Sequence, residues 1–169
     1  MHISSWPQFD PDQIQAASRV LGSGLVNSWT GPETKLFESE FASWCGCDYG
    51  VAVANGSLAL SSAYLSIGIH PGHEIITTPR TFIATASSAV LLGAKPVFAD
   101  VDRDSGAITA ATIEPLITSS TKAICVVHLA GWPADMKAIC DLARSYDLAV
   151  VEDCSQAHGA RIHGQSVGS

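Results

Sequence analysis

Apolar residues follow two different periods along the chain, and the change comes near residue 48. Before it, Phe37, Phe41 and Trp44 are spaced i, i+4, i+7, which predicts one apolar helix face that we expect to be core. After it, short apolar runs typical of buried strands alternate with longer segments typical of helices. We expect strands at 49–54, 74–77, 95–99, 123–127 and 148–151, and helices at 57–67, 81–92, 112–118 and 134–146.

Two helix starts are visible in the first part of the chain. Asp10 is a good N-cap, and Gln13 lies at the capping-box spacing behind it. Thr30 and Glu33 repeat this spacing, so we expect Thr30 to cap a second helix, which Gly46 ends. We therefore expect residues 1–48 to form an N-terminal helical segment.

Alternating strands and helices predict right-handed βαβ units. The fold class expected for residues 49–169 is therefore α/β, with a mostly parallel sheet and helices on both faces. No internal repeat or low-complexity tract interrupts this part of the chain.

Composition and charge narrow the class of protein. Of the 169 residues, 47% are hydrophobic and 15% are charged, which is globular composition. A net charge of −7 without a basic stripe argues against binding to nucleic acid or to a membrane surface. No signal peptide or membrane span is visible, so we expect a cytoplasmic protein. The five cysteines lack the paired spacing of zinc sites, and we expect no metal.

The apolar run at 148–151 ends in Glu152 and Asp153, and the candidate site is organised around this junction. Ligands of open α/β sheets bind beyond the carboxyl ends of the strands. Asp153 is therefore placed to meet a cationic group of a ligand, and Gln156 offers an amide to the same space. The alternative, that Asp153 only caps the segment after the strand, stays open.

Other strand ends carry residues suited to a ligand. Gly56 would let the backbone approach a ligand, and Ser57 is expected to cap the helix whose free N–H groups suit a phosphate. A plain turn with a helix cap is the alternative. Phe82 follows the second strand, where it would stack on a planar ring or anchor a helix in the core. His128 is either a base or ligand contact or a hydrogen-bonded structural histidine.

A phosphate cradle, an aromatic plate and a carboxylate at the strand ends of one sheet fit a flat, phosphorylated ring that contains nitrogen. Pyridoxal phosphate is such a group, because a carboxylate can keep its ring nitrogen protonated and make the ring an electron sink. Asp100, Asp102 and Asp104 have the spacing of a calcium loop but lack its terminal glutamate, so we expect a solvated turn.

Several motifs in order resemble the DegT/DnrJ/EryC1/StrS family of pyridoxal-phosphate-dependent sugar aminotransferases. The resemblance covers nearly the whole chain. It is carried by Trp29-Thr30-Gly31-Pro32, Asn55-Gly56-Ser57-Leu58-Ala59-Leu60, Thr81-Phe82-Ile83-Ala84-Thr85, the run GAKPVFADVD at 93–102, Val127-His128-Leu129-Ala130-Gly131, and Val151-Glu152-Asp153-Cys154-Ser155-Gln156-Ala157.

The resemblance implies roles for individual residues. Gly56 and Ser57 would hold the cofactor phosphate, Phe82 would stack on the pyridine ring, Asp153 would pair with the ring nitrogen, and Gln156 would contact the ring hydroxyl. It also implies a large domain of the aspartate-aminotransferase type (fold type I), followed by a smaller C-terminal domain, in a homodimer. The family typically moves an amino group from glutamate to a nucleotide-linked keto-sugar, for cell-surface polysaccharides or secondary metabolites.

The chain departs from the family pattern in one respect. The family's Schiff-base lysine lies in a Ser-Phe-x-x-x-Lys segment after the aspartate, and no such segment occurs up to Ser169. We therefore expect no catalytic residue in this chain, a truncated large domain without the small domain, and no activity of the chain alone. Two alternatives stay open: a non-catalytic or regulatory relative that binds pyridoxal phosphate or a nucleotide sugar, and a dehydratase with histidine in place of the lysine.

Overall fold

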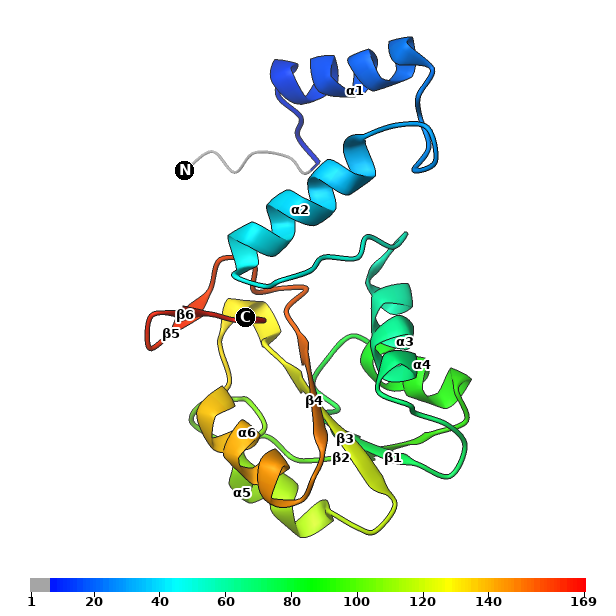
Figure 1. The fold of residues 1–169 in the computed structure, drawn as a ribbon. Helices are drawn as coiled ribbons and strands as arrows, with labels where there is room; N and C mark the ends of the chain where they lie inside the picture. The colour runs from blue at the N-terminus through cyan, green and yellow to red at the C-terminus, as the bar shows by residue number, and fades with distance from the viewer. Residues whose placement is uncertain (1–6) are drawn as a thin grey trace. The chain divides into compact units, whose positions relative to one another are not determined.

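The computed structural model describes residues 7–169, which form two compact units (Figure 1). The first unit reaches up to Trp44 and includes Asp48–Ala52, and the second consists of Cys45–Cys47 and Val53–Ser169. Residues 1–6 lie outside the described residues. They are part of the predicted N-terminal helical segment and of the stretch in which no signal peptide is visible. Within residues 7–169, no helix is both long and apolar enough to cross a membrane.

The first unit contains helices α1 (Pro11–Ser23) and α2 (Glu33–Cys45). The predicted capping box of α1 is confirmed, because the Asp10 and Gln13 side chains each accept the other residue's backbone N–H at 2.9 Å. The prediction that Thr30 caps α2 is wrong. The Thr30 hydroxyl instead donates to Asn27 Oδ1, which also accepts the backbone N–H of Trp29 and Thr30, so this side chain organises the turn before the helix.

The aromatic face of α2 is not core, contrary to the prediction. Phe37 and Trp44 are 54% and 55% exposed, and both rings pack on Phe41, with centroids 5.4 and 5.6 Å apart. Two helices supply too few neighbours to cover such a face: Ala42 is the buried residue of α2, and α1 has none. Helical spacing alone predicts the face and not what covers it.

The strand expected at 49–54 is absent from the described structure. A strand needs a hydrogen-bonded neighbour, and none of the described strands pairs with this segment. Tyr49 and Val51 are 88% and 82% exposed, and the Ala52 N–H donates to Glu38 Oε1 at 2.9 Å. An apolar run therefore does not suffice to form a strand here.

The second unit is built on a parallel sheet, so the predicted α/β class is confirmed. Its strands β1 (Glu74–Thr77), β2 (Lys95–Phe98), β3 (Thr121–Val127) and β4 (Ala149–Asp153) lie in the order β2-β1-β3-β4. All neighbours are parallel, with Val127 opposite Asp153. A short hairpin follows, formed by β5 (Arg161–Ile162) and β6 (Gln165–Ser166).

Helices cover both faces of the sheet, with α3 and α4 on one side and α5 and α6 on the other (Figure 1). They span Gly56–Ser66 (α3), Ala84–Leu91 (α4), Ala110–Ile113 (α5) and Met136–Ser145 (α6), with 3₁₀ turns at Glu114–Leu116 and Leu129–Gly131. The helix predicted at 112–118 is therefore shorter and starts earlier, because Thr109 caps it and Pro115 cannot donate a helical hydrogen bond.

Alternate residues of each central strand enter separate cores. Ile75 and Cys125 pack with Tyr64 on the side of α3 and α4. Their neighbours Ile76 and Val126 pack on the side of α5 and α6. All four strand side chains are fully or nearly fully buried, which fixes the register of the sheet and the position of its carboxyl ends.

Candidate functional site

A cavity of about 380 Å³ opens at the carboxyl ends of β3 and β4, beside the amino-terminal ends of α3 and α4. It lies wholly within the second unit. All the site residues predicted from the sequence line it: Gly56, Ser57, Phe82, Asp153 and Gln156. The fold thus brings together side chains that are almost 100 positions apart in the sequence, as the rule for strand carboxyl ends requires.

The amino-terminal end of α3 forms one wall of the cavity. Its N-cap is Asn55, whose Oδ1 accepts the Leu58 N–H at 3.0 Å, so the prediction that Ser57 is the cap is wrong. Asn55 has the extended backbone of a cap, whereas Ser57 lies inside the first helical turn. The Ser57 hydroxyl makes no hydrogen bond within residues 7–169 and lines the cavity with Gly56.

Gly56 is the first residue of α3 and lines this wall. A Cβ built on Gly56 would lie 3.8 Å from Ser155 Oγ, an ordinary van der Waals distance. The helix N-terminus, the Ser57 hydroxyl and the close backbone approach together suit a phosphate. The wall therefore fits the phosphate end of the cofactor suggested by the sequence.

Phe82 lies in the turn before α4, and its side chain borders the cavity. It is 66% exposed, so it does not anchor the first turn of a helix in the core, which was the alternative. An exposed aromatic face at a cavity edge can stack on a flat ligand ring.

Asp153 is the last residue of β4, two residues beyond the predicted end of that strand. Its Oδ1 accepts the Ser155 N–H at 3.2 Å and the Ser155 hydroxyl at 2.5 Å. Its Oδ2 accepts the Thr85 hydroxyl at 3.1 Å. The carboxylate thus shapes the turn after the strand and also faces the cavity, so the two roles considered for it coexist.

Gln156 is held by its carbonyl end. Its Oε1 accepts the Ala130 N–H at 2.9 Å, which fixes the side chain against the 3₁₀ turn Leu129–Gly131. The amide NH₂ is therefore the end that can donate to a ligand in the cavity.

His128 has a structural role. It is fully buried, its Nδ1 accepts the Ala134 N–H at 3.1 Å, and its Nε2 lies 2.8 Å from Glu152 Oε2. Because Nδ1 is an acceptor, the ring proton is on Nε2 and points at Glu152. Although Cys154 offers a sulfur within 4.8 Å of both, burial raises the pKa of its thiol to about 12, and no ring lone pair is left for a metal.

Two functional side chains escaped the sequence reasoning. Thr85 and Ser155 both hold the Asp153 carboxylate, one from α4 and one from the turn after β4. Ser155 carried a signal, since it lies two residues after an aspartate, the spacing of a local side-chain turn. Thr85 lies in the motif at 81–85, one helical turn after Thr81, but its contact with Asp153 depends on the tertiary fold.

Comparison with known proteins agrees with this geometry. The model of the DegT/DnrJ/EryC1/StrS aminotransferase family matches residues 7–169. An aminotransferase from Psychrobacter cryohalolentis is 52% identical, with a TM-score of 0.96, over 98% of this chain and 42% of its own. DesV of S. venezuelae is 41% identical, with a TM-score of 0.87, over 92% of this chain and 42% of its own.

A more distant relative informs on the cofactor. The putative sugar aminotransferase Spr1654 of Streptococcus pneumoniae, in its PLP form, is 26% identical, with a TM-score of 0.90, over 96% of this chain and 45% of its own. The chain thus spans somewhat less than half the length of these relatives. Their fold confirms the predicted large domain of fold type I, and the family uses pyridoxal phosphate. This chain belongs to the DegT/DnrJ/EryC1/StrS aminotransferase family.

Proposed function

We propose that the cavity binds pyridoxal phosphate and that the protein is an aminotransferase for a nucleotide-linked keto-sugar, with glutamate as the amino donor. The observation that carries this proposal is the convergence of Gly56, Ser57, Phe82, Asp153 and Gln156 on one cavity in a chain of this family. The sugar class is supported by the relatives, one of which is described as a putative sugar aminotransferase.

Each wall of the cavity has a distinct part in holding the cofactor. Gly56 and Ser57 bind the phosphate through the backbone N–H groups of the first turn of α3 and through the Ser57 hydroxyl. Phe82 stacks on the ring, and the Gln156 amide donates to the ring hydroxyl. Together these residues would hold the phosphate and the ring of the cofactor in the cavity.

Asp153 holds a proton at the ring nitrogen. When bound, the cofactor supplies an electron sink for the carbon that loses or gains a proton, and its strength depends on that ring proton. A carboxylate at hydrogen-bond distance stabilises the protonated nitrogen by a charge-assisted bond. Thr85 and Ser155 keep the carboxylate oriented, so it does not need to rearrange when the ring binds.

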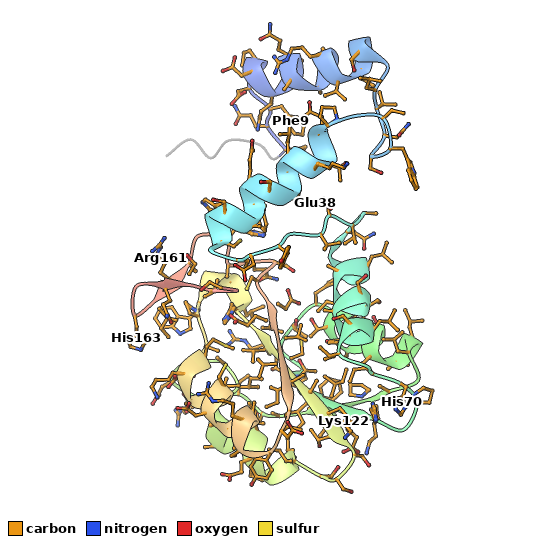
Figure 2. All side chains as sticks on the ribbon, viewed as in Figure 1. Phe9, Glu38, His70, Lys122, Arg161 and His163 are labelled. Atoms are coloured by element: carbon orange, nitrogen blue, oxygen red, sulfur yellow. The ribbon has the colours of Figure 1, made fainter. Side chains whose placement is uncertain are left out.

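No lysine lies at this cavity among the described residues of the second unit. Lys95 and Lys122 are at the amino-terminal ends of β2 and β3, opposite the cavity, and Lys137 is at the start of α6. Figure 2 labels Lys122 at this end of β3. Lys35, in α2, belongs to the first unit. We propose that the 169-residue chain holds the cofactor but transfers no amino group by itself, since transamination needs a lysine to move the proton.

Partners and location follow from the same proposal. The active protein would contain a smaller C-terminal domain that completes the sugar pocket, and it would work as a homodimer. Residues 1–48 would form its N-terminal helical segment, and 49–169 the first part of the cofactor-binding domain. The location that we propose is the cytoplasm, whose reducing environment would keep cysteine thiols free.

The direct test is a titration with pyridoxamine 5′-phosphate, which binds without a lysine. We expect saturable binding to the wild-type chain and a loss of about tenfold to a hundredfold in affinity for Asp153→Asn, the range of a charge-assisted hydrogen bond. Asp104→Asn, an exposed carboxylate in a turn away from the cavity, should bind like the wild type. Equal binding by both variants would contradict the role of Asp153.

A second candidate function is cofactor binding without catalysis. The observation that favours it is that all the residues predicted to hold the cofactor line one cavity within the second unit. The two functions differ in what happens when the lysine-containing part of a relative is supplied as a separate chain. Amino transfer to a keto-sugar in the mixture supports the enzyme, and cofactor binding without transfer supports the binding protein.

A further inference from the structure

Thr85 contacts the Asp153 carboxylate from behind the cavity. It is 1% exposed and does not line the cavity, whereas Asp153 does. Its hydroxyl donates to Asp153 Oδ2 at 3.1 Å across the space between α4 and β4. A group in this position acts on a ligand only through the carboxylate that it holds.

Thr85 is itself held at two points. Its backbone carbonyl accepts the hydroxyl of Tyr64, a fully buried residue of α3, at 2.9 Å. Its hydroxyl oxygen lies 2.9 Å from the hydroxyl of Thr81. Thr85 has one hydroxyl proton, and that proton points at Asp153, so Thr81 must be the donor in the second contact. The two hydrogen bonds therefore point the same way: Thr81 donates to Thr85, and Thr85 donates to Asp153.

The two oxygens of Asp153 are not equivalent. A carboxylate oxygen has two lone pairs, and both of those on Oδ1 are taken by the N–H and the hydroxyl of Ser155. Oδ2 accepts only from Thr85 within the described residues, which leaves one lone pair on this atom. The acceptor that remains for a ligand is thus on the oxygen that Thr85 contacts.

We propose that Thr85 is a positioning residue. It turns the Asp153 carboxylate so that Oδ2 accepts a hydrogen bond from the protonated ring nitrogen of the bound cofactor, and Thr81 fixes the direction of the Thr85 hydroxyl. This inference rests on the proposed cofactor site. It deepens that site by naming the oxygen used and the buried hydroxyl that selects it.

The experiment compares two probes on the 169-residue chain: pyridoxamine 5′-phosphate and its 1-deaza analogue, in which a carbon replaces the ring nitrogen. The test variant is Thr85→Val, which keeps the shape and removes the hydroxyl, and Thr85→Ser restores it. Thr77→Val is the matched control, because Thr77 is also fully buried and its hydroxyl donates to the Cys125 carbonyl at 2.9 Å. Circular dichroism identifies variants that do not fold.

For Thr85→Val we expect about tenfold weaker binding of pyridoxamine 5′-phosphate, because the charge-assisted hydrogen bond to the ring nitrogen loses its orientation. Binding of the deaza analogue, which lacks this bond, should be unchanged. Thr85→Ser and Thr77→Val should match the wild type with both probes. Thr81→Val should show a smaller loss, about threefold, again only with pyridoxamine 5′-phosphate. If Thr85→Val does not fold, Thr81→Val is the test variant in its place.

Two outcomes would overturn the role of Thr85, and a third would overturn the cofactor site on which it rests. Equal losses with both probes would mean that Thr85 only shapes the cavity. Unchanged binding of pyridoxamine 5′-phosphate to both Thr85→Val and Thr81→Val would mean that Asp153 needs no orienting hydroxyl. If the wild type binds neither probe, or binds both equally well, the failure lies in the proposed cofactor site itself and not in the role of Thr85.

Discussion

Glu152 and Asp153 are adjacent carboxylates at the end of one strand, and they have separate tasks. Successive strand residues point to opposite faces, so Asp153 meets Thr85 of α4 whereas Glu152 meets the buried His128. Glu152 also accepts the Gly168 N–H at 2.9 Å and so ties the end of the described chain to β4. At the scale of residues, one carboxylate is available to a ligand and the other fixes the backbone around it.

Glu74, a carboxylate at the opposite end of the sheet, makes the stability of the fold depend on pH in the acid range. Glu74 accepts the Thr118 hydroxyl at 2.6 Å and the Lys95 ammonium at 2.9 Å, and these bonds hold the pKa of Glu74 below its ordinary value of 4.5. A carboxyl with a lowered pKa in the folded state adds stability above its unfolded pKa, and this stability is lost as the pH falls through the folded pKa.

We therefore predict that Glu74→Gln lowers the free energy of unfolding at pH 7 by about 1 kcal/mol. The difference from the wild type should shrink as the pH falls below 4.5. Urea unfolding at pH 7 and pH 3 measures both values. A difference between Glu74→Gln and the wild type that stays constant from pH 7 to pH 3 would disprove the coupling.

At the scale of elements, the start of a helix depends on which residue keeps the extended backbone of an N-cap. Asn55 is extended and its side chain caps α3, whereas Ser57 is already helical and is left for the cavity. The sequence Asn55-Gly56-Ser57 offers two capping residues, and short-range preferences rank them as nearly equal. The extended backbone of Asn55 in the folded protein decides between them.

The cap can be tested by a matched pair of variants. We predict that Asn55→Ala lowers the free energy of unfolding by about 1 kcal/mol, the usual loss for an N-cap, because the Leu58 N–H loses its acceptor. Ser57→Ala should leave stability within about 0.5 kcal/mol of the wild type, since its hydroxyl bonds nothing in residues 7–169. Thermal unfolding of both proteins decides, and the reverse order would restore Ser57 as the cap.

At the scale of the whole molecule, the second unit combines the cavity with an open sheet whose outer strands are β2 and β4. The edge strand β4 has a single neighbour, β3, among the described strands. Unpaired strand edges tend to associate, so we expect the chain alone to be prone to association. The residues proposed to bind the cofactor line the cavity, and no lysine of the described second unit lies beside them.

Borohydride reduction after addition of pyridoxal phosphate tests whether any lysine of this chain forms the Schiff base. We predict that no lysine is labelled preferentially: Lys35, Lys95, Lys122 and Lys137 should carry only the low, even labelling of exposed amines, as seen by mass spectrometry of peptides. An Asp153→Asn chain should give the same pattern. Stoichiometric labelling of one lysine in the wild type alone would show that this chain contains its own Schiff-base residue.

The sequence by itself determined the fold class, the four paired strands and the residues around the cavity, because strand periodicity, strand ends and family motifs are local signals. Only the tertiary structure decided what depends on partners distant in sequence. It left residues 49–54 without a strand neighbour and the aromatic face of α2 half exposed. It brought Thr85 against Asp153 across 68 positions, a contact that no spacing along the chain encodes.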